Sequence, residues 1–324
     1  MDLKKIKPAV KGASKAGYHS ISAMFRCPKE YQLSAIRQIS VPRTLLPDPL
    51  AIGSLFHEGR AHWFQSGFPT GAKYWQPLIS YINASADTSN PPIRQEAVNR
   101  TLSYLEQYCT YWAMRTKPNV VHTEYEVGPA PLAEGDPLYQ YRTARLDDVS
   151  EYPEANYKLC IGECKTTSVS VEDVVNEYTL HGQPMLQYLL WQMSANGHKK
   201  HVKKHGPVNY VLLDVIVKGY GKERCQFGRH AIPFTDFSLD WYKQSMTWAL
   251  EVANQMKYDT LEVPRIPTSC TRLVGRARIA CPFRDLCRFG KGAANRYVDA
   301  EGHGLSNPKY NEYNVKPWEG QSNV

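Results

Sequence analysis

The stretch Ile161-Gly-Glu-Cys-Lys-Thr-Thr-Ser-Val169 decides the fold of this chain, because it predicts a strand that carries two charged side chains. Glu163 and Lys165 lie two residues apart, so both side chains point to the same face of that strand. Asp147 lies sixteen residues before Glu163, at the end of another strand-like run, Tyr141-Arg-Thr-Ala-Arg-Leu-Asp147. An aspartate and a Glu-x-Lys pair on neighbouring strands can hold a divalent metal ion beside an ammonium group, which suits phosphodiester hydrolysis.

The apolar patterning around these strands switches between helical and strand periods. It predicts helices over residues 18–38, 51–66, 93–116, 184–196 and 236–257. It predicts further strands, so that the full set covers residues 122–127, 139–149, 157–166, 208–217 and 225–233. This order indicates an α/β fold with one mixed central sheet flanked by helices, to which the N- and C-terminal segments add a second layer.

The chain is expected to form one domain over residues 1–292, followed by a polar tail over 293–324 that is only loosely ordered. The domain divides into a helical part (1–117), a sheet core (118–235) and a C-terminal helix with a cysteine-bearing segment (236–292). Hydrophobic residues make up 42% of the 324 residues and charged residues 22%, which allows a buried core and argues against wholesale disorder.

The net charge of +8 favours a polyanionic partner. The sequence contains no run of about 18 apolar residues, so we expect no membrane span. The N-terminus also lacks the apolar stretch of a signal peptide. We therefore expect a cytoplasmic protein with no membrane partner. In that compartment cysteines stay reduced or bind metal.

The charged residues leave structural alternatives open. A Glu-x-Lys pair is common on the solvent face of a strand, and Asp147 and Asp148 would also suit a strand that ends in a turn. Glu124 or Glu126, on the preceding strand, would add a carboxylate to a metal site, and the sequence does not choose between them. The carbonyl of Cys164 is a further candidate ligand, whereas its side chain points to the opposite face as a small core residue.

The pattern resembles that of the PD-(D/E)XK nucleases, and within them the RecB-like exonuclease branch. Gly53-Ser-Leu-Phe-His57 is similar to the Gly-x-x-x-His element of that branch. Gln187-Tyr-Leu-Leu-Trp191 is similar to its Gln-x-x-x-Tyr motif, with Trp in place of Tyr. Gln183 and Tyr188 form an alternative pair, one residue too far apart for the motif.

This resemblance implies a restriction-endonuclease-like core, and it implies a role for each matching residue of the site. His57, Asp147 and Glu163 would be ligands of Mg²⁺ or Mn²⁺, and Lys165 would be the catalytic lysine. Gln187 would orient that lysine or touch the DNA backbone.

Four cysteines, Cys27, Cys270, Cys281 and Cys287, are enough to hold a [4Fe–4S] cluster. Cys281-Pro-Phe-Arg-Asp-Leu-Cys287 resembles the last cysteine pair of iron–sulfur nucleases of the AddB type and of the CRISPR-associated adaptation nucleases. Those families place one cysteine before the nuclease core and three after it, with a Cys-x-x-Cys pair where this chain has the wider gap from Cys270 to Cys281.

Such a cluster would close a loop of over 240 residues and act as a structural staple. A Cys₄ zinc site is the alternative, but zinc sites favour closely spaced cysteine pairs, which this set lacks. The other four cysteines are expected to be buried core residues: Cys109, Cys160, Cys164 and Cys225.

The resemblance implies a metal-dependent DNA exonuclease that acts on single-stranded or frayed DNA ends, in recombination, repair or phage DNA metabolism of a bacterial or phage-infected cell. The basic run His198-Lys-Lys-His-Val-Lys-Lys-His205 is either a solvated loop or a phosphate contact. The sequence does not decide whether the protein has a protein partner or forms a homo-oligomer. The alternative functions are a non-catalytic DNA-binding or partner scaffold of the same fold and an RNA-processing nuclease.

Overall fold

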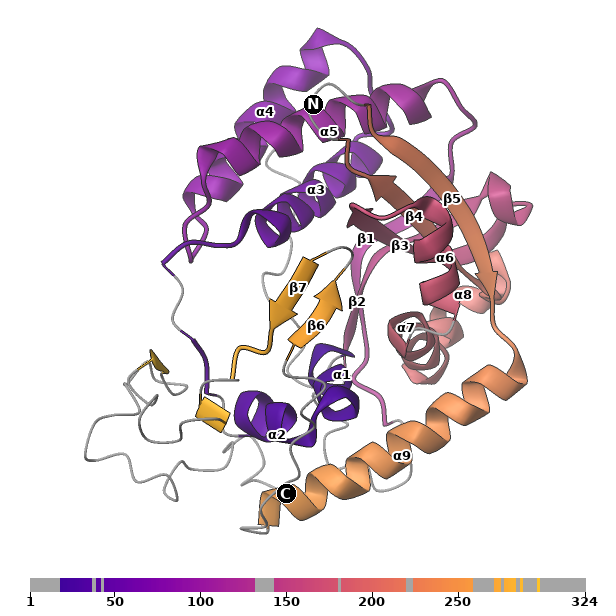
Figure 1. Ribbon diagram of the computed structural model, residues 1–324. Helices are drawn as coiled ribbons and strands as arrows, with labels where there is room; N and C mark the ends of the chain where they lie inside the picture. Colours follow the sequence, from indigo (N-terminus) through magenta and orange to yellow (C-terminus); the bar gives the residue numbers. More distant parts are fainter. Residues whose placement is uncertain are drawn as a thin grey trace.

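The computed structural model describes most of the chain between residues 18 and 297 (Figure 1). The described residues are 18–36, 39–41, 44–131, 143–179, 182–219, 224–258, 271–274, 277–283, 286–287 and 296–297. Cys270 and the predicted polar tail, apart from residues 296–297, lie outside them. No helix among the described residues is long and apolar enough to cross a membrane.

A five-stranded mixed sheet forms the centre of the fold, with its strands in chain order. The strands are β1 (Asn119–Val127), β2 (Ala144–Tyr152), β3 (Lys158–Thr167), β4 (Tyr210–Val217) and β5 (Gln226–Pro233). β3 and β4 are parallel, and the other neighbours are antiparallel. Parallel neighbours need a crossover connection, and helices between β3 and β4 supply it. The predicted α/β class with a mixed, helix-flanked sheet is confirmed.

α3 (Asp48–Gln65) and α5 (Gln95–Ala113) cover one face of the sheet, and α4 (Ala72–Asp87) packs against these two helices. Their inward side chains form an aromatic-rich core that includes Trp63 and Tyr108. Cys160 and Cys164 of β3 and Leu212 of β4 point into this core. The alternate residues of β3 must therefore face the other side of the sheet.

The opposite face is covered by α6 (Val171–Thr179), α7 (Gly182–Met193), α8 (His198–His205) and α9 (Asp236–Tyr258). Leu186 and Leu190 of α7 pack with Val149 of β2 and Ile161 of β3. α9 closes this layer along the bottom of Figure 1, next to α7. Glu163 and Lys165 share the strand parity of Ile161, so they belong to the side covered by α6 and α7.

The helix predicted over residues 18–38 is interrupted, and that prediction is wrong at Cys27. The segment consists of α1 (Tyr18–Arg26), α2 (Pro28–Tyr31) and a π-helical turn over Gln32–Ile36. Cys27 has an extended backbone with φ −159° and ψ 108°. The ring of Pro28 explains the break, because it disfavours helical geometry in the preceding residue.

Several elements lie where the sequence patterning predicts none. They are α4, α6 and a hairpin of β6 (Thr271–Val274) and β7 (Ala277–Ala280). α4 carries Pro77 inside the helix, a residue that normally argues against a helix interior. The basic run is also not a loop, because residues 198–205 form α8 between Gly197 and Gly206. Lysine is a good helix former, which explains the difference.

Candidate metal centre

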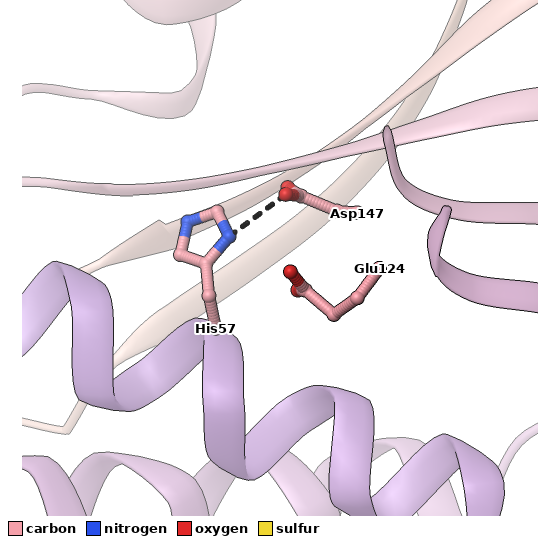
Figure 2. Close-up of side chains that lie close together, drawn as sticks. All are labelled: His57, Glu124 and Asp147. Atoms are coloured by element: carbon pink, nitrogen blue, oxygen red, sulfur yellow. Dashed lines mark ion pairs between the residues drawn. The ribbon is translucent and has the colours of Figure 1, made fainter. Parts of the chain in front are cut away.

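The site begins with a histidine on α3 that faces an aspartate on β2. α3 packs on the sheet through Ile52, Leu55 and Phe56, which are at most 1% exposed, and His57 follows directly. The Nδ1 atom of His57 lies 3.0 Å from Oδ1 of Asp147 (Figure 2). Two residues singled out in distant parts of the sequence are thus in direct contact.

Glu124 on β1 completes a group of three possible ligands. One ligand atom each from His57, Glu124 and Asp147 lies within 4.8 Å of the others (Figure 2). Glu124 is partly buried, whereas Glu126 is exposed. The structure therefore selects Glu124 from the two glutamates that the sequence leaves open. This is the only such group among the residues that the structure describes.

The second carboxylate oxygen of Asp147 is used to position the aspartate. The backbone N–H of Cys164 donates a hydrogen bond to Oδ2 of Asp147 at 2.7 Å. This bond lies just past the last paired residues of the two strands, Asp148 and Gly162, and extends the contact between β2 and β3. It leaves Oδ1 to face His57. The side chain of Cys164 is buried on the opposite face of the sheet, as predicted.

Glu163 lies beside this group and is held by two glutamines of α7. Gln183 donates from Nε2 to Oε1 of Glu163 at 2.5 Å, and Gln187 donates from Nε2 to Oε2 at 2.7 Å. Lys165 lies on the same face of β3, with its Nζ 5.4 Å from the centre of the Tyr178 ring. The predicted ligand set is therefore divided: His57 and Asp147 are grouped with Glu124, while Glu163 contacts the two amides.

The electrostatics of the site show crowded negative charge. Burial, followed by the charge of Asp147, raises the pKa of Glu124 and that of Glu163 to about 7 each. Burial opposes the charged form of His57, but the charge and hydrogen bond of Asp147 outweigh it and raise the pKa of His57. Burial likewise opposes ionisation of Asp147, yet His57 keeps the pKa of that carboxyl lowered. A cation placed between these groups would relieve the repulsion.

The two glutamines that the sequence offers as alternatives for the motif contact the same carboxylate. Gln183 and Gln187 lie one helical turn apart, and both reach Glu163. Trp191, one turn further along α7, is 1% exposed and packs in the core. Tyr188 stacks on Phe234, with ring centres 4.3 Å apart. The two amides thus form the face of α7 that contacts Glu163, and Trp191 packs in the core.

A buried ionic network supports the site from the other face of the sheet, and it was not predicted. Arg60, one turn after His57 on α3, lies 2.8 Å from Asp148 and 3.3 Å from Asp214. Tyr152 donates from its hydroxyl to Asp148 at 2.8 Å. A Cβ atom at Gly162 would lie 2.1 Å from Oδ2 of Asp148, so this position has no room for a side chain. Asp148 is therefore a buried strand residue and not part of a turn.

A sequence signal for this network did exist. Asp214 interrupts the apolar run of residues 208–217, in which a charge is unexpected for a strand buried on both faces. A charge that is 0% exposed needs a partner of opposite sign. The partners, Arg60 and Arg229, come from α3 and β5. Their positions in the sequence do not reveal this pairing.

The predicted cluster cysteines are only partly within the described residues. Cys27 is buried at the break between α1 and α2. Cys281 and Cys287 are half-buried and pack against a small core that joins Leu33 and Ile39 to the segment around Phe283. The segment after Cys27 and the segment of Cys281 and Cys287 therefore meet in space. The other four cysteines, Cys109, Cys160, Cys164 and Cys225, are buried as predicted.

Comparison of the chain with protein-family models and with curated proteins finds no match. Function is therefore inferred from the residues of the site and their geometry.

Proposed function

We propose that this protein is a divalent-metal-dependent nuclease that hydrolyses phosphodiester bonds in DNA, in the manner of the RecB-like branch of the PD-(D/E)XK nucleases. One observation carries the proposal: His57, Glu124 and Asp147 converge from α3, β1 and β2, beside Glu163 and Lys165 on β3. An acidic metal site with an adjacent lysine suits the hydrolysis of a phosphodiester.

The donor set fits a hard or borderline divalent cation. The two carboxylates suit Mg²⁺ or Mn²⁺, and the imidazole adds a ligand that borderline divalent ions accept. Burial, followed by the charge of Asp147, raises the pKa of Glu124 and that of Glu163 to about 7 each, although Arg145 and Lys165 oppose these shifts. A divalent ion held by these ligands would supply Lewis-acid polarisation of a phosphoryl oxygen.

The chain's own residues then have separate roles. Asp147 positions His57 through the 3.0 Å contact, and its own orientation is set by the N–H of Cys164. Lys165 extends from the same strand face as Glu163 and would neutralise the negative charge that develops on the phosphate. Gln187 and Gln183 restrain Glu163 at both of its oxygens. Gln187 would thus orient the glutamate, in addition to the roles that the resemblance implies for it, which are to orient the lysine or to touch the DNA backbone.

Hydrolysis of end-labelled oligonucleotides tests the proposal. Protein stripped with a chelator and supplied with Mg²⁺ or Mn²⁺ should cleave single-stranded DNA, and Lys165→Ala should lower the rate by about 100-fold or more. Lys158→Ala is the matched control, because Lys158 is exposed on the same strand, away from the site. Equal activity in Lys165→Ala and in an active wild type would contradict the catalytic role of Lys165, and the absence of metal-dependent hydrolysis in the wild type would favour a binding scaffold.

The nucleic-acid class is tested with DNA and RNA strands of matched sequence. The net charge of +8 supports a polyanionic substrate of either kind. We propose DNA with single-stranded or frayed ends. Cleavage of the RNA strand alone would contradict this part of the proposal and leave the metal-dependent hydrolysis standing.

The proposal includes a [4Fe–4S] cluster held by Cys27, Cys270, Cys281 and Cys287. Its support is the packing of the segment after Cys27 against the segment that carries Cys281 and Cys287. A cluster spaces its thiolates more widely than a single metal ion does. It would join the N-terminal helices to the C-terminal segment of the domain.

A further inference from the structure

The basic helix α8 (His198–His205) has two chemically different faces. His201 is buried, and His198, Val202 and His205 are half-buried. Four lysines are exposed on the other face: Lys199, Lys200, Lys203 and Lys204. Lys199 and Lys203 are four residues apart, as are Lys200 and Lys204, so the four ammonium groups form one stripe along the helix.

The inner face of α8 is fixed by ring contacts. The ring of His201 stacks on Trp191 of α7, with ring centres 5.2 Å apart, and meets His122 of β1 edge-on at 4.9 Å. The Nδ1 atom of His205 lies 2.9 Å from a carboxylate oxygen of Glu151 on β2. The lysine stripe is therefore held at a defined place on the molecule.

The turn before α8 is joined to the strand that carries Glu124. Asn196 accepts a hydrogen bond at its backbone oxygen from the hydroxyl of Tyr125 at 2.7 Å. Its side chain donates to the backbone oxygen of Glu126 at 2.9 Å and accepts from the N–H of Gly128 at 3.3 Å. These bonds lie next to Glu124 in β1, so α8 and the candidate metal centre share one support.

The positive charge of the stripe is compensated only weakly within the described residues: the pKa of Glu151 is lowered mainly by the hydrogen bond to His205 and to a smaller extent by the charge of Lys204. No ion pair joins any of the four lysines to a described acidic residue, and α8 itself contains no acidic residue. Like charges four residues apart destabilise a helix. The fold therefore presents concentrated positive charge despite this repulsion, which the helix propensity of lysine and the position of Lys203 and Lys204 in the last turn offset in part.

We propose that the lysine stripe of α8 binds the phosphate backbone of the DNA substrate outside the catalytic site. A regular row of ammonium groups complements a regular row of phosphates, because each neutralised phosphate releases a counterion. An acidic membrane surface is the weaker match, because an interfacial helix inserts an apolar face and the inner face of α8 is packed against His122 and Trp191. The inference rests on the proposed function for the identity of the substrate.

Binding of a fluorescent single-stranded oligonucleotide, measured by anisotropy in the presence of a chelator, tests the inference without catalysis. The test variant changes all four stripe lysines to glutamine, which keeps helix propensity. The control variant changes four exposed lysines on separate elements to glutamine, with the same loss of charge: Lys73, Lys117, Lys158 and Lys243.

The stripe variant should bind about tenfold more weakly or worse near physiological salt, and the slope of log K against log salt should become shallower by up to about 3. The control variant should change both quantities far less. Equal losses in the two variants would overturn the inference, because they would show an effect of net charge alone. Binding of the wild type to phosphatidylserine vesicles but not to the oligonucleotide would overturn it as well.

A small phosphodiester, bis(p-nitrophenyl) phosphate, separates this inference from the proposed function. It is too short to span the catalytic site and α8 together, so the stripe variant should hydrolyse it like the wild type. If the wild type hydrolyses no phosphodiester yet binds DNA through the stripe, the proposed function fails and the inference about α8 stands.

Discussion

Glu124, a residue of the group that could hold a metal ion, has an unusual backbone conformation. Its φ of 47° lies in the left-handed region, which is uncommon for a non-glycine residue and costs about 1–3 kcal/mol. Its carboxylate approaches Asp147, although burial and the charge of Asp147 raise its pKa to about 7. Arg145 compensates in part, with its Nε 3.1 Å from Oε2 of Glu124. Backbone strain and charge repulsion at one position fit the role proposed for Glu124 as a metal ligand.

Glu124→Gln should weaken Mn²⁺ binding by about tenfold or more in titration calorimetry. Loss of residues that only support metal ligands already costs about 10–100-fold in affinity, and Glu124 is a candidate ligand itself. The melting temperature without metal should not fall, because the change removes one of two repelling carboxylates. Glu126→Gln, which changes an exposed glutamate on the same strand, is the control. Equal affinity losses in the two variants would contradict the assignment.

The environment of His122 predicts that the folded protein loses stability in acid. Burial, together with the positive charges of His201, Lys200 and His205, lowers the pKa of His122 from 6.5 to about 4. As the pH falls from 6.5 towards 4, His122 binds a proton in the unfolded chain but stays neutral in the folded chain. The free energy of unfolding therefore decreases through this window, and the contribution of His122 is constant below it.

Replacing His122 with glutamine should make the melting temperature fall less steeply between pH 7 and pH 4.5. The measurement is a series of thermal melts across that range. His230→Gln, on an exposed histidine of β5, should leave the slope of the wild type unchanged. A slope that stays the same in His122→Gln would show that the acid sensitivity has another source.

At the scale of elements, a buried ionic contact sets how α3 lies on the sheet. Arg60 and Asp148 are 2.8 Å apart, with side chains 2% and 0% exposed. Arg60 lies three residues after His57, and Asp148 directly follows Asp147. Because this contact fixes the helix against the strand, it also brings His57 to Asp147 on the other side of β2.

Arg60→Met should lower the free energy of unfolding by about 3–5 kcal/mol, because it leaves the carboxylates of Asp148 and Asp214 short of a buried cation. Chemical denaturation measures the change. Arg94→Met is the matched control: Arg94 pairs with Asp48 at the surface, is 53% exposed, and its loss should cost less than about 1 kcal/mol. Similar losses in both variants would contradict the importance assigned to the buried network.

At the scale of the whole molecule, the N-terminal helices and the C-terminal segment meet around Leu33 and Phe283. These parts lie at opposite ends of the domain in sequence. A covalent or metal cross-link between such distant segments restricts the unfolded chain strongly in the loop-entropy model. The proposed cluster would therefore act on the stability of the domain rather than on catalysis.

Protein purified without oxygen should be brown and contain about four iron atoms per chain if the cluster is present. Cys281→Ser should lose the visible absorbance and most of the iron and melt at a lower temperature. Cys109→Ser is the control and should keep the iron, because Cys109 lies on α5 and its side chain is buried in the core. Colourless protein with one bound zinc ion would contradict the iron–sulfur proposal.

The sequence by itself determined the class of the fold and most of the candidate residues. Periodicity is a local property, so the alternation along β3 was enough to place Glu163 and Lys165 on one face and Cys164 on the other. For the same reason the five strands and the helices that carry His57 and Gln187 were found. Local rules failed at Cys27, where Pro28 breaks a helix, and at α4, which contains Pro77.

Only the tertiary structure decided which of these residues act together. Glu124 and Glu126 have the same strand parity, and the backbone at Glu124 and the approach of α3 distinguish them. The pairing of Arg60 with Asp148 likewise depends on how α3 lies on β2. The physical reason is that hydrogen bonds, ion pairs and ligand groups require distances of about 3 to 5 Å between side chains that are far apart in sequence, and local patterning does not specify those distances.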